Sequence, residues 1–148
     1  MYSLIPAADS HCLAMLPRLR ANDALLLRTV GGEPLHAMRY SIEQSVESWA
    51  WMVDNEPAAL FGYAAPSLMG DVAFPWCMTT DTVTQHWIEF WRGSRGIVDY
   101  IRGRYPRLEG CCDARYEASL RWLRVLKFKV SEPVLVPALG LSFCHWTG

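Results

Sequence analysis

The sequence contains no long apolar run and no excess of charge of either sign. None of the apolar stretches in its 148 residues approaches the roughly 20 residues that span a bilayer, and no basic-then-apolar secretion signal opens the chain. The 14 basic and 15 acidic side chains give a net charge of -1, so no overall field attracts nucleic acid. These absences predict an intracellular protein without a membrane span and without a nucleic-acid partner.

Paired metal ligands are absent as well. The five cysteines show no ligand spacing, and their odd number without a secretion signal favours reduced thiols that are buried as small hydrophobes. The four histidines show no ligand spacing either. We therefore expect no metal site.

The remaining composition is that of an ordinary globular domain. Apolar residues make up 51% of the chain and charged residues 20%, which argues against disorder. A chain of 148 residues is long enough to bury a substantial core. We expect one domain, residues 1–148.

The first half of the chain shows a clear hairpin. Trp49, Trp51 and Val53 alternate with smaller residues, the turn Asp54-Asn55 follows, and a second strand is predicted at 56–65. Before the hairpin the pattern predicts a strand at 2–5, a helix that Asp9 or Ser10 caps and that Pro17 ends, and helices at 22–30 and 34–45.

A strand and a long helix follow the hairpin. In the strand at 72–79, Pro75 cannot donate to a ladder, which indicates either a bulge or an unpaired side. Thr80 or Asp81 caps a helix whose apolar stripe continues to residue 105. Glycines at 93, 96 and 103 interrupt this pattern, each at a cost of about 1 kcal/mol against alanine. Either a turn lies at 92–96 or another element packs closely there.

Residues 107–130 form the unit around which the chain is organised. A buried strand at 108–112 precedes Asp113, which is expected to cap a helix at 116–126. A half-exposed strand is predicted at 127–130, and two short strands at 134–136 and 141–146 end the chain. The order predicts an α/β domain with a mixed sheet of about six or seven strands, flanked by helices.

The helix of this unit has a buried stripe and a basic outer face. Leu120, Leu123 and Leu126 recur at helical spacing. Trp122 lies off this stripe beside Arg121 and Arg124. Because tryptophan and arginine are enriched at binding hot spots, we predict an exposed interface there.

The element order resembles the GNAT fold of acyl-CoA N-acyltransferases. Residues 107–130 are similar to that family's second motif, in which a strand leads into a helix that ends in Gly-Phe. More narrowly, the strings SWAWMVDNEPAALFGYAAPSLMG, VAFPW, YPRLEGCCDAR and SLRWLRVLKF resemble a phage family that contains the internal virion protein A of short-tailed phages. This similarity extends from about Ser45 to Phe128. It implies virion or assembly proteins as partners, in the host cytoplasm during infection or in the virion.

The broader resemblance implies an acetyl-CoA site. In that family the fourth strand separates from the fifth, the pantetheine arm lies in the gap, and backbone N–H groups hold the pyrophosphate. The implied cofactor-binding residues are Cys77, Met78, Thr79, Arg92, Gly93, Ser94, Arg95, Gly96 and Tyr116. The alternative for 92–96 is an irregular helix with solvated arginines. Asp81 and Glu109 are candidate bases, against helix capping and an exposed strand end.

The sequence also departs from the GNAT pattern. TTDTVTQHW follows the fourth strand where the family has a glycine-rich pyrophosphate loop. Tyr116 stands for the usual Asn, Lys127 for the Gly of Gly-Phe, and Leu123 for the general-acid Tyr. Leucine cannot donate a proton to a thiolate.

Two functions follow from these matches and departures. The first is a phage protein with a GNAT-like fold and degraded catalytic machinery, acting in virion morphogenesis or as an internal virion component. The alternative is an active acetyl-CoA-dependent N-acetyltransferase acting on a protein lysine or a small amine.

Overall fold

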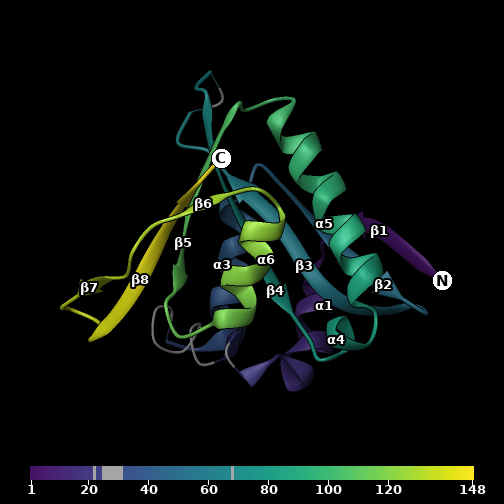
Figure 1. The fold of residues 1–148 in the computed structure, drawn as a ribbon. Coiled ribbons are helices and arrows are strands. Elements are labelled where there is room, and N and C mark those ends of the chain that lie inside the picture. Colours follow the sequence, from purple (N-terminus) through teal and green to yellow (C-terminus); the bar gives the residue numbers. More distant parts are fainter. Residues whose placement is uncertain (22, 25–31, 68) are drawn as a thin grey trace.

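The computed structural model describes residues 1–21, 23–24, 32–67 and 69–148 (Figure 1). Most of the helix predicted at 22–30 lies outside these residues. No helix within the described ranges is long and apolar enough to cross a membrane. The elements are β1 (Tyr2–Pro6), α1 (Asp9–Met15), the 3-10 helix η1 (Leu16–Arg18), α3 (Pro34–Gln44), β2 (Glu47–Val53), β3 (Glu56–Ala64), β4 (Val72–Thr79), α4 (Thr82–Gln85), α5 (Trp87–Arg102), β5 (Arg107–Asp113), α6 (Glu117–Val125), β6 (Lys129–Val130), β7 (Val134–Val136) and β8 (Leu141–Thr147).

One mixed sheet of eight strands forms the centre, slightly more than the six or seven expected. The strand order is β1-β2-β3-β4-β5-β8-β6, and β7 pairs with β8 beside this path. The β4–β5 pair is parallel, and the other pairs are antiparallel. The mixed α/β architecture predicted from the sequence is confirmed.

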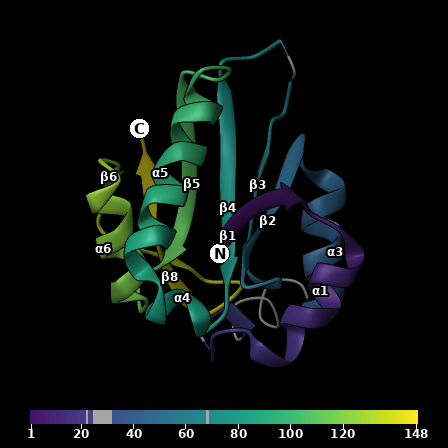
Figure 2. The ribbon, with the colours of Figure 1, turned by 90° about the vertical axis from the view of Figure 1, so that its right-hand side faces the viewer.

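Helices cover both faces of this sheet. Figure 2 shows α5 and α6 on one side and α1 and α3 on the other. The alternation in β2 explains the two cores, because Trp51 and Val53 join the cluster under α5 and α6, whereas Ala50 packs in the cluster under α1 and α3. The hairpin between β2 and β3 turns at Asp54 and Asn55, whose φ angles of 49° and 68° suit a tight two-residue turn.

Helix α5 is continuous through residues 92–96, so no turn lies there. A methyl group placed on Gly93 would lie 3.6 Å from Nε1 of Trp51, whereas one on Gly96 would meet no atom within 4 Å. The 3.6 Å distance at Gly93 is an ordinary van der Waals contact, so a side-chain methyl group would fit at both positions and close packing does not explain these two glycines. The predicted long helix breaks earlier, at His86, between α4 and α5.

Three predicted caps differ from the structure. Neither Asp9 nor Ser10 caps α1, because the helix begins at Asp9 and Ala8 precedes it. The Asp9 carboxylate instead pairs with Arg39 of α3. Asp81 does precede α4, but its side chain makes no capping hydrogen bond.

The third wrong cap is Asp113, since α6 begins only at Glu117. The Asp113 carboxylate is fully buried. It accepts a hydrogen bond from the backbone N–H of Arg115 at 2.9 Å and pairs with the Arg115 guanidinium at 2.8 Å. A carboxylate that closes a turn before the helix leaves the same sequence pattern as a cap. Beyond α6, Lys127 has a φ of 73°, a left-handed conformation that suits the glycine expected there.

Candidate functional site

The site begins where β4 and β5 separate. They pair only at Val72 with Arg107 and at Ala73 with Leu108. On its other edge β4 stays paired with β3 from Phe74 to Thr79. The remainder of β4 therefore has one closed edge and one open edge, as the resemblance implies.

Whether a residue of β4 has an odd or an even number decides toward which edge of the strand its backbone N–H and C=O groups point. The Asp71 carbonyl accepts a hydrogen bond from Arg107 of β5, while the Thr80 N–H donates to Ala58 beside β3. Backbone groups alternate in direction along a strand. The backbone N–H and C=O groups of odd-numbered residues in β4 therefore point toward β5, and those of even-numbered residues point toward β3. Pro75 lies on the open edge, so the interpretation of an unpaired side is correct.

The backbone groups of Thr79 at this open edge already have hydrogen-bond partners. The Asp23 carboxylate accepts hydrogen bonds from the Thr79 N–H at 2.9 Å and from the Thr79 hydroxyl at 2.6 Å. The Thr79 carbonyl accepts a third from the Arg20 N–H. Met78 points to β3. Of the three backbone positions expected to hold pantetheine, Cys77 is the one whose N–H points into the gap.

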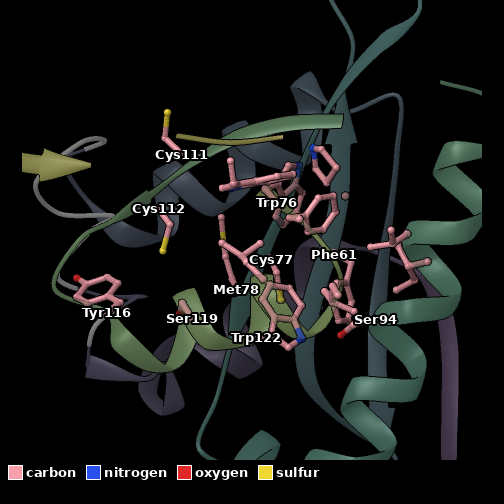
Figure 3. A pocket seen from close by; sticks show the side chains of 18 of the residues that line it. Phe61, Trp76, Cys77, Met78, Ser94, Cys111, Cys112, Tyr116, Ser119 and Trp122 are labelled. Atoms are coloured by element: carbon pink, nitrogen blue, oxygen red, sulfur yellow. The ribbon is translucent and has the colours of Figure 1, made fainter. Parts of the chain in front are cut away.

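A cavity of about 260 Å³ fills the gap between β4 and β5, and we call it the split cavity (Figure 3). Most of its lining is apolar, and β3, β4, β5, α5 and α6 all contribute. Ser119 of α6 and Tyr116, the residue before this helix, also line it, and in Figure 3 the Tyr116 hydroxyl points away from the other labelled residues. Figure 3 also shows Cys111 and Cys112 pointing in opposite directions from β5. The lining therefore suits a mostly apolar group.

Trp122 belongs to this cavity, so its predicted exposure is wrong. Its ring stacks on Phe90 of α5, with 5.8 Å between centroids and 27° between planes. Its Nε1 is buried and has no hydrogen-bond partner in the described part of the chain. The buried arc of α6 is wider than the leucine stripe because α5 covers it from the side. Arg121 and Arg124 are exposed, so the predicted interface retains only its arginines.

The residues from Arg92 to Gly96 do not form a phosphate loop. They lie within α5, where backbone N–H groups bond to carbonyls one turn earlier. Ser94 is buried, donates to the Phe90 carbonyl at 2.8 Å, and lines the split cavity. Arg92, Arg95 and Gly96 are exposed. Of this group, only Ser94 lies with Cys77 at the cavity.

The connection after β4 also lacks a phosphate cradle among the described residues. The N–H groups of Val83 and Thr84 are already bonded to Thr80 and Asp81. Helix α4 is only one turn long, and an exposed carboxylate, Asp81, precedes it. The described residues therefore suit a pantetheine arm, and they do not suit a pyrophosphate.

The two candidate bases lie away from the chemistry. Asp81 lines neither cavity of this region, and Glu109 pairs with Arg107 at 3.6 Å. Leu123, at the expected general-acid position, is buried in the wall of the split cavity. The described residues contain no group of three or more His, Cys, Asp or Glu side chains that could hold a metal.

Several titratable groups that are partly or fully buried line the cavity. Burial raises the pKa of the Asp23 carboxyl, whereas the hydrogen bonds from Arg115 lower the pKa of Asp113. Burial also raises the pKa of the Cys112 thiol to about 12, and that of Cys77 well above its usual range. Both thiols are therefore protonated at neutral pH.

Sequence reasoning missed Asp23 and Ser119. Ser119 precedes Leu123 by four residues, so helical spacing alone could have placed it on the cavity side. Asp23 reaches Thr79 across 56 positions, and no local pattern reports such an approach.

The fold has close counterparts among solved structures. An N-acetyltransferase from Staphylococcus aureus Mu50 superposes with a TM-score of 0.71 at 15% identity, covering 100% of this chain and 98% of the other. A GNAT-family acetyltransferase from Bacillus anthracis gives 0.72 at 5% identity, covering 99% and 93%. The ribosomal-protein α-N-acetyltransferase RimL, in complex with coenzyme A disulfide-bonded to one of its cysteines, gives 0.67 at 13% identity, covering 99% and 93%. The chain therefore has the GNAT acetyltransferase fold.

The sequence comparisons add no narrower relationship. No protein-family profile matches the chain. No curated protein matches it either.

Proposed function

We propose that this chain binds an acyl-CoA through its pantetheine arm in the split cavity and transfers the acyl group to an amine. The observation that carries the proposal is the open edge of β4 beside an apolar cavity of about 260 Å³. The solved structure of RimL with coenzyme A supports it, because that enzyme shares the fold.

The backbone at the open edge can hold an extended amide-containing arm. The Pro75 carbonyl and the Cys77 N–H and carbonyl point into the gap, and they can pair with a ligand as a neighbouring strand would. These backbone groups fit an arm that carries amide N–H and carbonyl groups.

The residues of the chain have two roles in the proposed reaction, which are to stabilise the acyl oxygen and to donate a proton. When bound, the thioester supplies an acyl carbon that an amine nitrogen attacks while the C–S bond breaks and the thiol leaves. The Cys77 N–H is directed to donate to an acyl oxygen in the gap, where developing negative charge is stabilised. Ser119 lines the cavity one helical turn before Leu123 and takes the proton-donating place that Leu123 cannot fill.

Calorimetry with acetyl-CoA, with coenzyme A as the comparison ligand, tests the proposal. Ser119→Phe should fill the cavity and weaken binding by at least about tenfold, or about 1.4 kcal/mol. The matched control is Ala118→Phe, which adds the same ring to an exposed position of the same helix. Absence of binding to the unmodified chain, or equal binding by the two variants, would overturn the proposal.

A virion role remains a second proposal, from the narrower resemblance to the phage family. Leu123 in the general-acid position and the connection without glycine after β4 favour a fold kept without catalysis. In that case the chain should sediment with particles of a phage that encodes it, and Arg121→Ala with Arg124→Ala should reduce incorporation. Particles free of the chain would count against this role.

A further inference from the structure

A second cavity, of about 490 Å³, opens on the opposite face of the sheet. We call it the α3-side cavity, since Tyr40, Ser41 and Gln44 of α3 form one wall. Pro75, Trp76 and Cys111 line both this cavity and the split cavity. The two cavities therefore adjoin at the gap between β4 and β5, one on each face of the sheet.

Three large aromatic side chains, Tyr40, Phe74 and Trp76, line the α3-side cavity. Tyr40 and Phe74 are 55% and 39% exposed, and Trp76 lies between the two cavities. The Trp76 ring is held in place, because its Nε1 donates to the Ser45 hydroxyl at 2.7 Å and the ring lies against Gly62. No Asp, Glu, Lys or Arg is among the described residues that line this cavity.

Such a lining selects among amines. Aromatic faces attract an ammonium group and also pack against an aromatic or apolar body. A polyamine carries several positive charges, each of which needs a carboxylate or water when it is bound. This cavity therefore suits one ammonium group attached to an apolar or aromatic body.

A proton acceptor lies beside the opening. His145 of β8 pairs in register with Cys111 of β5, so both side chains project from the same face. His145 is exposed and lines the α3-side cavity. Histidine is the usual side chain for taking a proton near neutral pH.

We propose that the α3-side cavity is the acceptor site for an aromatic or apolar primary amine, and that His145 takes the proton from its ammonium group. The proposal rests on the proposed function, since it gives the acyl group an acceptor. The proton moves from the ammonium nitrogen to an imidazole nitrogen of His145, which leaves a neutral amine facing the gap.

Cys111 provides a readout that needs no turnover. It is the exposed cysteine of the five, and the others are buried or partly buried. The rate of its alkylation by iodoacetamide is measured by mass spectrometry with phenethylamine or with spermidine present. Phenethylamine should slow the reaction by about tenfold near saturation, and spermidine should not. Equal protection by both amines, or protection by neither, would overturn the acceptor assignment.

Variants assign the protection to this cavity. Phe74→Ala should weaken phenethylamine protection by roughly two- to fivefold, the value of an exposed cation–π contact. Trp87→Ala is the matched control, because it removes an aromatic ring that is 60% exposed on α5. Equal effects of the two variants would contradict the site.

His145 is tested separately, in the presence of acetyl-CoA. His145→Ala should slow transfer to phenethylamine while leaving acetyl-CoA binding unchanged, and added imidazole should restore part of the rate. An unchanged rate would remove His145 from the reaction. If the unmodified chain does not bind acetyl-CoA but phenethylamine still protects Cys111, the proposed function is overturned and the amine site remains supported.

Discussion

The two edges of β4 consist of the same eight residues but differ in their hydrogen bonding. The edge toward β3 is paired from Phe74 to Thr79, whereas the edge toward β5 is paired only at Val72 and Ala73. Backbone alternation assigns each residue to one edge. The backbone groups of Pro75 and Cys77 therefore face the gap, and those of Met78 pair with β3. A strand can stabilise the fold on one edge and offer a binding surface on the other.

The sharpest test of this comparison uses proline at two adjacent positions. Met78→Pro removes a ladder hydrogen bond to β3 and a buried side chain, so the free energy of unfolding should fall by about 3 kcal/mol or more. Cys77→Pro removes an N–H that faces the gap, so it should cost clearly less and instead abolish acetyl-CoA binding. Urea denaturation and calorimetry measure both effects. Equal destabilisation would show that the two edges are not distinct.

The same contrast extends to α6, where neighbouring residues face the cavity and the solvent. Trp122→Ala should lower the free energy of unfolding by about 2–4 kcal/mol, because it removes a ring stacked on Phe90. Arg124→Ala should change it by less than about 0.5 kcal/mol, since Arg124 is exposed. If Trp122→Ala unfolds at the same urea concentration as the parent chain, the ring is not packed in the wall.

Glycines sharpen the comparison at a smaller scale. A methyl group on Gly62 would lie 2.5 Å from the Trp76 ring, which hydrogen bonding to Ser45 holds across the closed side of β4. Gly62→Ala should therefore cost about 1–3 kcal/mol in unfolding free energy. Gly96→Ala meets open space on α5 and should stabilise the chain by about 1 kcal/mol. Thermal denaturation of both variants checks the two signs, and a shift of the same sign would contradict them.

The smallest expected effect concerns Asp23, whose carboxylate occupies the end of the open edge. Burial raises its folded pKa above 3.8, so the folded state holds the proton more tightly than the unfolded state. Its contribution to stability is greatest below pH 3.8 and decreases as the pH rises through the folded value. Asp23→Asn keeps an acceptor for Thr79 without this titration.

Denaturation of the parent chain and of Asp23→Asn at pH 4 and pH 7 measures this effect. The variant should gain stability relative to the parent as the pH rises, by roughly 1 kcal/mol or less. A relative loss at pH 7 would mean that the ionised carboxylate stabilises the fold.

Predictions made from local patterns were mostly accurate. The hairpin, β4, β5 and the terminal strands lie within a residue or two of their predicted bounds, and the turn at Asp54-Asn55 is confirmed. The caps at Asp9 and Asp113 were wrong, because their carboxylates form ion pairs with Arg39 and Arg115 instead. A short acidic side chain before a helix looks the same in sequence whether it caps, pairs or closes a turn.

The candidate site was less predictable than the fold. The resemblance anticipated the separation of β4 from β5, and with it the backbone of Cys77. The resemblance could not show that the Thr79 N–H donates to the Asp23 carboxylate. Nor could it show that α5 is continuous from Arg92 to Gly96. Trp122 was misplaced because helical periodicity reports one direction toward a core, whereas α6 packs against both the sheet and α5.

By itself the sequence determined the elements of this protein and their order, because propensity, alternation and turn residues act over a few positions. Only the tertiary structure decided where β4 and β5 separate, which amides remain open, and which side chains meet across the sheet. These depend on contacts between residues far apart in the chain, such as Asp23 with Thr79 and Cys111 with His145. Local patterns carry no record of such contacts, so a shared gap with two cavities becomes visible only once the chain has folded.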